Sequence, residues 1–417
     1  MRFSIVNLGC KVNRVESDGF AQLLTARGGS ASPLADADVV VVNTCTVTGE
    51  AEKKTRKAVR HALRESAAPL VIVTGCAAAI DARVFEDMSP RVRVVPKAGM
   101  ALFLEEETPE ATPSPLASAA TPEDRAPHAA TPFSSHTRVG VKVQDGCDNA
   151  CTYCIVHVAR GRATSRPAAA IRAEVLQLAE AGVREIVLTG INLGSYRDSV
   201  LRLADLLELL LADTACVHGS DEAPPRLRIS SVEPMDIDDA VIDVLARADG
   251  RVCRHLHLPL QAGSTRVLAE MARPYSAEEY RALVARIRAA VPQIALTTDI
   301  IVGFPGETDE DFAATCDLAR ACGFSKIHVF PYSQRTGTPA AARPDQIDPA
   351  VKAARARELR ALAAELRRAD YTARVGNHEL ALVEEQNRAM TESYYEVCAP
   401  ASAPVGTLVD IEIPPSA

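Results

Sequence analysis

The sequence has few of the features that mark nucleic-acid-coating, secreted or membrane proteins. It contains no tryptophan and only 4% aromatic residues, so extensive base-stacking surfaces are not expected. Its formal net charge of −8 excludes a strongly basic protein, although not a local basic groove. No apolar run reaches the roughly 18 residues that span a bilayer, and the start MRFSIVNLGC lacks the long apolar region of a signal peptide. We therefore expect a cytoplasmic protein without a membrane partner.

The composition is otherwise that of a soluble protein with more than one core. The chain has 417 residues, of which 47% are apolar and 24% charged, so two or three domains are expected. It also contains 11 cysteines. Because disulfides are rare in a reducing compartment, cysteines that cluster indicate metal binding or catalysis.

Residues 1–104 predict a small parallel α/β domain. Three short runs, RFSIVNL, DVVVVNT and LVIVTG, are typical of strands, and EAEKKTRKAVRHALRE between the second and third has helical composition. Residues 105–136 are rich in Pro, Ala, Ser and Thr and have few large apolar side chains. Such a composition predicts an extended or disordered linker.

Residues 137–370 predict a second α/β domain. Helical stretches separate most of its six strand candidates, which are RVGVKVQ, REIVLTG, RLRISSV, RHLHLPL, ALTTDIIVG and SKIHVFPY. Six successive βα units indicate an open, partial α/β barrel with functional loops at the carboxyl ends of its strands. A long helix, PAVKAARARELRALAAELRRADYTAR, follows the last strand. The short alternating strands of residues 371–417 predict a small antiparallel β-barrel.

Three cysteines, Cys147, Cys151 and Cys154, follow the strand RVGVKVQ at C-x3-C-x2-C spacing. The residues alone leave three interpretations open. His157 could complete a zinc site of three cysteines and one histidine, or the thiols could be reduced and partly buried. They could also hold a 4Fe–4S cluster with one iron open to an exogenous ligand. That arrangement is chemically useful, because a substrate can react at the open metal.

Three further cysteines, Cys10, Cys45 and Cys76, each lie within three residues of the end of a predicted strand of the first domain. The carboxyl ends of neighbouring parallel strands share one edge of a sheet, where ligand sites are built. We expect the three to converge on a second cluster with its own open iron. The alternative is coincidence among ordinary core cysteines.

The cysteine spacing, with Tyr153 directly before the last cysteine, resembles the signature of the radical S-adenosylmethionine superfamily. With the second cysteine group, the partial barrel and the terminal β-barrel, almost the whole chain resembles the methylthiotransferase family. The motifs most similar to those of the tRNA N6-threonylcarbamoyladenosine methylthiotransferases are LGCKVN, NTCTVT, QDGCDNACTYC, ARGRATSR, LTGIN, RISSVEP, HLPLQAGS, TDIIVGFPGET and FPYSQRTGTPAA. The resemblance implies an N-terminal methylthiotransferase domain, a radical S-adenosylmethionine domain and a TRAM-type RNA-binding domain.

The resemblance also implies two 4Fe–4S clusters and S-adenosylmethionine as cofactors. Cys10, Cys45 and Cys76 would hold one cluster, and the C-x3-C-x2-C cysteines would hold the other. The positions that match the family's cofactor-binding motifs are Tyr153, Thr189, Gly190, Asn192, Ser230, Glu233, Gln261, Val302 and Gly303. All but the tyrosine lie at or just after the carboxyl end of a predicted strand, on one rim of the barrel.

The reaction implied by the resemblance has two parts. One S-adenosylmethionine methylates sulfur attached to the first cluster, and a second supplies the radical that activates carbon 2 of the modified adenine just 3′ of the anticodon. No side chain need act as a conventional acid or base, so none is assigned. The implied partners are the tRNA anticodon loop and an electron donor that the sequence does not identify, and we expect a monomer.

Candidate contacts to tRNA lie in HVARGRATSRPAAAIR, which contains no acidic residue. Arg160, Arg162 and Arg166 could bind phosphates there through their guanidinium groups. The helix Lys352–Arg374 carries seven basic residues against three acidic ones, which a solvated amphipathic helix explains equally well. Acidic residues in the terminal strands argue against an RNA surface over that whole domain.

Two rival functions remain. A sister methylthiotransferase would act on isopentenyladenosine in tRNA or on an aspartate of a ribosomal protein. A rival of another class is a non-catalytic RNA-binding protein that holds zinc. Metal analysis separates the classes, because the zinc protein would contain about one zinc and no acid-labile sulfide, and the enzyme about eight irons.

Overall fold

The structure is a computed structural model that describes residues 1–46, 49–107, 137–217 and 223–415. The chain divides into two compact units, Met1–Ser135 with Ile155–Arg162, and His136–Cys154 with Ala163–Ala417. The predicted linker falls almost wholly outside the described residues. Within the described ranges, no helix has both the length and the apolar character needed to cross a membrane.

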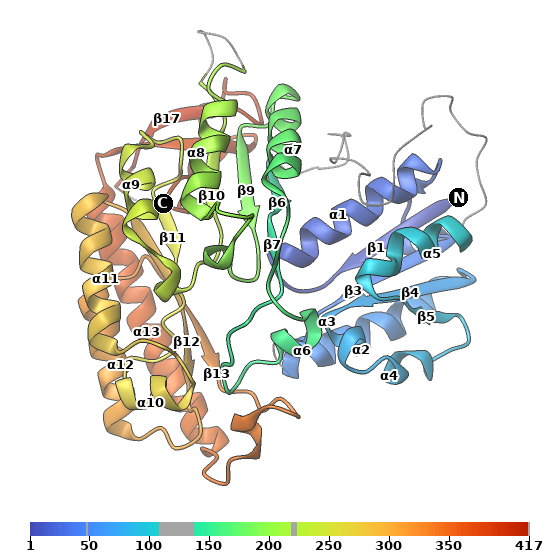
Figure 1. The fold of residues 1–417 in the computed structure, drawn as a ribbon, viewed down its shortest axis with the longest axis horizontal. Coiled ribbons are helices and arrows are strands. Elements are labelled where there is room, and N and C mark those ends of the chain that lie inside the picture. Colours follow the sequence, from blue (N-terminus) through green and yellow to red (C-terminus); the bar gives the residue numbers. More distant parts are fainter. Residues whose placement is uncertain (47–48, 108–136, 218–222, 416–417) are drawn as a thin grey trace. The chain divides into compact units, whose positions relative to one another are not determined.

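The first unit is built on a five-stranded parallel sheet with the order β2-β1-β3-β4-β5 (Figure 1). The strands are β1 (Arg2–Asn7), β2 (Ser30–Ala31), β3 (Val39–Thr44), β4 (Leu70–Gly75) and β5 (Val92–Val94). The helices are α1 (Lys11–Ala26), α2 (Gly49–Glu65), α3 (Cys76–Ile80), α4 (Arg83–Glu86), α5 (Met100–Glu107) and α6 (Val156–Arg160). The three predicted strands and the predicted helix are confirmed.

Side chains of the central strand β3 alternate between two hydrophobic cores. Val42 shares one core with Val59 of α2, whereas Val41 shares the other with Leu24 of α1. Successive side chains of a strand point to opposite faces of a sheet. The four consecutive valines of DVVVVNT can all be buried because helices cover both faces of the sheet, and the polar residues stand at the ends of the run.

The second unit contains six parallel strands in chain order. They are β6 (Arg138–Lys142), β9 (Glu185–Thr189), β10 (Arg226–Ile229), β11 (His255–His257), β12 (Ala295–Val302) and β13 (Lys326–Pro331). They form two three-stranded sheets, and isolated parallel bridges from Ser231 to His257 and from Leu227 to Val252 join the two. A short antiparallel pair, β7 (Gln144–Asp145) and β8 (Thr164–Ser165), follows β6. All six predicted strands are confirmed as an open, partial α/β barrel.

Helices cover one side of these strands (Figure 1). They are α7 (Ala168–Glu180), α8 (Leu203–Asp213), α9 (Asp239–Arg247), α10 (Thr265–Glu270), α11 (Ala277–Ala290), α12 (Asp309–Cys322) and α13 (Pro349–Arg374). Local sequence sets where several begin: Ser276 with Glu279 and Thr308 with Asp311 form capping boxes at α11 and α12. The core between strands and helices includes Leu256.

The chain ends in a four-stranded antiparallel sheet with the order β16-β15-β14-β17. Its strands are β14 (His378–Glu385), β15 (Arg388–Thr391), β16 (Glu396–Cys398) and β17 (Leu408–Glu412). It belongs to the same compact unit as the barrel strands, although the sequence predicted a separate domain from residue 371.

A buried charge cluster joins this C-terminal sheet to the barrel. Glu185 of β9 pairs with Arg226 and Arg228 of β10, each at 2.6 Å, and all three side chains are at most 1% exposed. The guanidinium of Arg226 also donates to the carbonyl of Leu380 at 2.6 Å, and that of Arg228 to the carbonyl of Glu392 at 2.6 Å. Burial raises the pKa of Glu185, but the charges of the two arginines outweigh burial and lower it to about 2.

Candidate active site

The first cysteine group lies at the carboxyl edge of the first sheet, as predicted. Strands β1, β3 and β4 are neighbours, and the register pairs Thr44 with Gly75. Cys45 and Cys76 follow these paired residues directly, and Cys10 precedes α1 after β1. Three thiols therefore follow three adjacent strand ends, where an open α/β sheet builds its ligand sites.

Two glycines allow the backbone to come close at this edge. Gly9 has φ +114°, and a Cβ there would lie 2.9 Å from Sγ of Cys45. Gly75 has φ +96°, and a Cβ there would lie 2.4 Å from the carbonyl oxygen of Thr44. A side chain at either position would be strained and would clash. The glycines in LGCKVN and TGCAA thus seat the loop of Cys10 against Cys45 and begin α3 at Cys76.

Arg160 reaches the same group of thiols from α6. Its Nε donates to Sγ of Cys76 at 3.2 Å, and its other nitrogens reach Asn13 Oδ1 at 2.6 Å and Glu16 Oε1 at 3.1 Å. The side chain is 2% exposed. The guanidinium of Arg160, a predicted RNA contact, is therefore buried and engaged within the first unit. Sequence reasoning missed Asn13 and Glu16, which stand one and two turns after Cys10 on α1.

The second cysteine group occupies the loop after β7, and its main polar neighbour was also missed. The guanidinium of Arg273 donates to Sγ of Cys151 at 3.2 Å, to Glu233 at 3.3 Å and, through Nε, to the hydroxyl of Tyr275 at 3.0 Å. Its side chain is 1% exposed. Arg273 thus ties the C-x3-C-x2-C loop to the predicted cofactor residue Glu233. An isolated arginine in MARPYS gave no signal in the sequence.

Burial sets the protonation of groups in this loop. It raises the pKa of the Cys147 thiol and raises the pKa of Tyr153 well above its usual value. Tyr153 packs against the cluster that includes Phe304 and Ala262. The side chain of Tyr153 is therefore neutral and presents a largely apolar surface beside the cysteines.

The predicted residues Thr189, Gly190 and Asn192 form a tightly bonded turn after β9. Thr189 Oγ1 donates to the carbonyl of Val141 at 3.2 Å. Gln144 Oε1 accepts the backbone N–H of Asn192 at 3.0 Å, and a Cβ on Gly190 would lie 2.9 Å from that oxygen. The Asn192 side chain donates to Asp236 at 2.6 Å. These side chains hold the turn in place.

Ser230 differs from its neighbours. Its hydroxyl is buried, and no group in the described part of the chain forms a hydrogen bond with it. A buried hydroxyl without a partner is costly, and a ligand hydroxyl would satisfy it. This observation is compatible with the prediction that Ser230 is a cofactor-binding residue.

The remaining predicted cofactor positions, Val302, Gly303 and Gln261, contribute a core side chain and two backbone conformations with positive φ. The side chain of Val302 lies in the core under the outer helices, which leaves no side-chain surface for a cofactor. Gly303 has φ +70°, and a Cβ there would lie 2.4 Å from Cγ of Lys352. Gln261, with φ +69°, donates its backbone N–H to the carbonyl of Asp299 at 2.9 Å. At Val302 and Gly303 the backbone is therefore the part that a cofactor could meet, and their place beside the cofactor stays a prediction.

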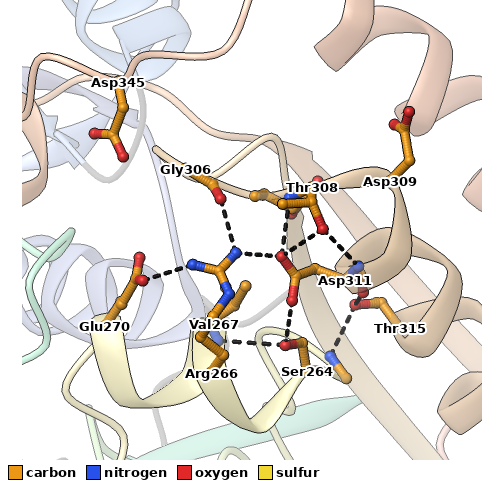
Figure 2. Close-up of polar contacts among 12 residues, drawn as sticks. Ser264, Arg266, Val267, Glu270, Gly306, Thr308, Asp309, Asp311, Thr315 and Asp345 are labelled. Carbon is orange, nitrogen blue, oxygen red and sulfur yellow. Dashed lines mark hydrogen bonds and ion pairs between the residues drawn. The ribbon is translucent and has the colours of Figure 1, made fainter.

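Figure 2 shows the contacts that hold the LPLQAGS loop against the start of α12. Asp311 accepts a hydrogen bond from Ser264 at 2.6 Å and forms an ion pair with Arg266. The backbone N–H of Gly263 donates to Thr315 Oγ1 at 2.9 Å, and a Cβ on Gly263 would lie 2.4 Å from Cα of Thr315. Although burial alone would raise it, hydrogen bonds from Arg266 and Ser264 lower the pKa of Asp311, which therefore stays ionised. The loop is rigidly fixed at the carboxyl end of the barrel strands.

The other basic candidates differ in how they are engaged. Arg166 is partly buried, donating to the carbonyl of Lys142 at 2.7 Å and pairing with Glu174 at 2.7 Å. Arg162 is exposed. On α13, Arg355 pairs with Glu307 and Arg374 pairs with Glu379, and the four side chains are largely buried. These pairs remove two cations from the basic surface predicted for this helix. His157, the alternative zinc ligand, lies on α6 with an exposed side chain.

The chain matches two protein families. Residues 2–96 match the Uncharacterized protein family UPF0004, and residues 141–319 match the Radical SAM superfamily. The fold is similar to that of the radical S-adenosylmethionine methyltransferase TsrM from Kitasatospora setae, with a TM-score of 0.58 and 17% identity over 82% of this chain and 77% of that chain.

Curated relatives resemble the chain over nearly its whole length. The threonylcarbamoyladenosine tRNA methylthiotransferase MtaB of Bacillus subtilis is 38% identical over 92% of this chain and 85% of its own length. The protein of the same name from Chlamydia pneumoniae is 34% identical over 99% and 95%. The tRNA-2-methylthio-N(6)-dimethylallyladenosine synthase of Sphingopyxis alaskensis is 35% identical over 99% and 94%. The chain is a member of the radical S-adenosylmethionine tRNA methylthiotransferase family.

Proposed function

We propose that the protein is a tRNA N6-threonylcarbamoyladenosine methylthiotransferase that inserts a methylthio group at carbon 2 of the adenine just 3′ of the anticodon. The observation that carries the proposal is the presence of two three-cysteine groups, one at the carboxyl ends of three parallel strands and the other in the loop that follows β6 and β7. The 38% identity to an enzyme of that name over most of both chains supports the choice of substrate.

The residues present fit two 4Fe–4S clusters and S-adenosylmethionine. Cys10, Cys45 and Cys76 would hold one cluster. Cys147, Cys151 and Cys154 would hold the other, and three thiolates leave one iron open for the amino and carboxylate groups of S-adenosylmethionine. The unpartnered hydroxyl of Ser230 offers a hydrogen bond to a bound cofactor. When bound, these groups supply the methyl donor, the sulfur and the radical.

The chain's own residues position these groups and exclude water from them. Arg160 and Arg273 each donate a hydrogen bond to a cysteine of one group, which positions that side chain. Tyr153 and the cluster around Phe304 keep the second site apolar on one side. No side chain is assigned as a general acid or base.

A second candidate substrate is isopentenyladenosine in tRNA. It is favoured by the relative from Parafrankia named tRNA-2-methylthio-N(6)-dimethylallyladenosine synthase, which is 37% identical over 93% of this chain and 78% of its own length. We propose further that the enzyme acts in the cytoplasm as a monomer, that Arg162 and the C-terminal sheet contact tRNA, and that a separate reductase donates electrons.

Mass spectrometry of tRNA nucleosides from a strain without the gene tests the substrate. We expect 2-methylthio-N6-threonylcarbamoyladenosine to disappear, unmodified threonylcarbamoyladenosine to accumulate in its place, and a plasmid copy to reverse both changes. Loss of the methylthio derivative of isopentenyladenosine instead would assign the second candidate substrate. No change in either nucleoside would contradict both.

Replacing Arg160 with glutamine should damage the first cluster site and spare the second. The variant loses the hydrogen bond to Cys76 and leaves buried Glu16 with Lys97 as its cation. Outer groups that orient metal ligands typically contribute about 10- to 100-fold in metal affinity or activity. We expect methylthio transfer to fall by about that factor, with iron and sulfide lost preferentially from one of two clusters and cleavage of S-adenosylmethionine little changed.

The matched control for this experiment is Arg14→Gln. Arg14 is exposed on α1 beside Asn13, so its removal changes charge on the same helix without touching the thiols. Equal loss of cluster in both variants, or loss of S-adenosylmethionine cleavage in Arg160→Gln, would contradict the role of Arg160.

A further inference from the structure

Three side chains that suit a metal ion come together on adjacent strands of the second unit. His257 lies on β11, Asp299 on β12 and His328 on β13, and the strand register pairs Asp299 with His328. One ligand atom from each lies within 4.8 Å of the other two. None of the three belongs to the cysteine groups or to the predicted cofactor positions.

This cluster lies on the face of the strands opposite the outer helices. Leu256 and Ile300, the chain neighbours of His257 and Asp299, belong to the core under those helices. Because side chains alternate along a strand, the histidine and the aspartate point the other way. Their side chains are 18% and 31% exposed, so an ion can reach them.

A hydroxyl group orients the ring of His257. Oγ1 of Thr297 lies 2.9 Å from Nδ1 of His257 and 3.1 Å from Nε2 of His255. The hydroxyl has only one proton. When Thr297 donates that proton to His255, its oxygen accepts the Nδ1–H of His257, and Nε2 of His257 keeps a lone pair.

In that tautomer the lone pair of His257 Nε2 faces a carboxylate. Nε2 of His257 lies 3.4 Å from Oδ1 of Asp299. Two electron-rich atoms at this separation repel each other unless a proton or a metal ion lies between them. A metal-ligating histidine usually donates its other N–H to an oxygen, which is the role Thr297 can play here.

We propose that His257, Asp299 and His328 bind one divalent transition-metal ion of the zinc or iron(II) class. Two imidazoles and one carboxylate are a donor set that such ions accept, and three protein ligands leave a position open for water or a substrate oxygen. The proposal stands on the geometry of these strands and does not depend on which nucleoside the enzyme modifies.

Zinc binding to the full-length holoprotein tests the site. The protein is prepared without oxygen with both clusters in place, so that the six cysteines are occupied, then equilibrated with zinc sulfate, desalted and analysed for zinc and iron. We expect about one zinc per chain. Asp299→Asn and His328→Gln should each lose most of this zinc while keeping the iron content of the unaltered protein.

The matched control is His378→Gln. His378 pairs with Asp410 at 3.1 Å on the exposed surface, and among the described residues this histidine and carboxylate belong to no group of three possible metal ligands. We expect this variant to bind as much zinc as the unaltered protein. Equal zinc in all four proteins would overturn the proposal, and so would an unaltered protein that binds no zinc. In either case His257 and Asp299 would form an imidazolium–carboxylate pair in place of a metal site.

X-ray absorption at the zinc edge of the unaltered holoprotein gives a second test that needs no variant to fold. We expect only nitrogen and oxygen neighbours, at about 2.0–2.2 Å. A sulfur shell at about 2.3 Å would place the zinc on cysteine and overturn the assignment.

Discussion

The Cys151→Ala variant is expected to lose cleavage of S-adenosylmethionine to below detection, whereas Cys45→Ala keeps that cleavage and loses methylthio transfer. The two cysteines follow strands of different sheets and have different neighbours, Arg273 for Cys151 and the Gly9 loop for Cys45. With two cysteines left, the open iron cluster is not held, so the radical cannot form. Chromatography of 5′-deoxyadenosine and mass spectrometry of tRNA nucleosides, both under anaerobic conditions, measure the two activities.

Cys216→Ala is the matched control, because Cys216 is exposed and lies after α8, away from both groups in the sequence. It should retain both activities. If Cys45→Ala abolished cleavage as completely as Cys151→Ala, with the second cluster shown to be intact by its iron content, the two groups would not have separate roles.

The Glu185→Gln variant is expected to show the largest loss of stability. It leaves Arg226 and Arg228 buried without a counter-charge, and removing one partner of a buried ion pair typically costs about 3–5 kcal/mol. We expect a lower urea midpoint and early proteolytic cleavage between α13 and the C-terminal sheet, because the two arginines also bond the carbonyls of Leu380 and Glu392. Asp213→Asn, which breaks the more exposed pair with Arg172, is the control and should cause a much smaller change.

The same carboxylate makes stability depend on pH. The pKa of Glu185 is lowered from its usual 4.5 to about 2 in the folded chain. Because the unfolded chain takes up this proton first, the stabilisation is complete above pH 4.5 and is lost as the pH falls from 4.5 towards 2. Glu185→Gln should flatten that part of the pH profile, and an unchanged slope would show that another carboxylate controls it.

Local patterns predicted most of the fold. The three longer strands of the first sheet follow from β-branched runs, all six barrel strands were among the predicted strand segments, and the helix Pro349–Arg374 was predicted at its observed bounds. The strands β2 and β5, of two and three residues, were missed because so short a segment shows no alternation. The assignment of Ile155–Arg162 to the first unit was missed too, since nothing local in that segment indicates which sheet it joins.

The parts of the candidate site that follow the ends of strands could be predicted from the sequence. The parts that depend on contacts between residues far apart in the sequence could not. The six cysteines follow from spacing and strand ends. Arg160 and Glu16 are 144 residues apart in the sequence, and Arg273 and Cys151 are 122 apart. A buried arginine looks like a surface arginine in a sequence, so Arg160 was predicted to bind RNA. Only the fold reveals which cations are enclosed.

The hydrogen bonds from arginines of the barrel to the C-terminal sheet affect how much conformational freedom is lost when a ligand binds to that sheet. A module tethered by a loose chain samples many orientations and must lose that freedom when its ligand binds. Here the guanidinium groups of Arg226 and Arg228 on β10 donate hydrogen bonds to backbone carbonyls of β14, of β15 and of the residue after β15. These bonds hold the C-terminal sheet in a fixed position against the barrel strands. Any ligand bound on this sheet would therefore be held at a fixed position relative to the barrel strands, without first losing the orientational freedom of a tethered module.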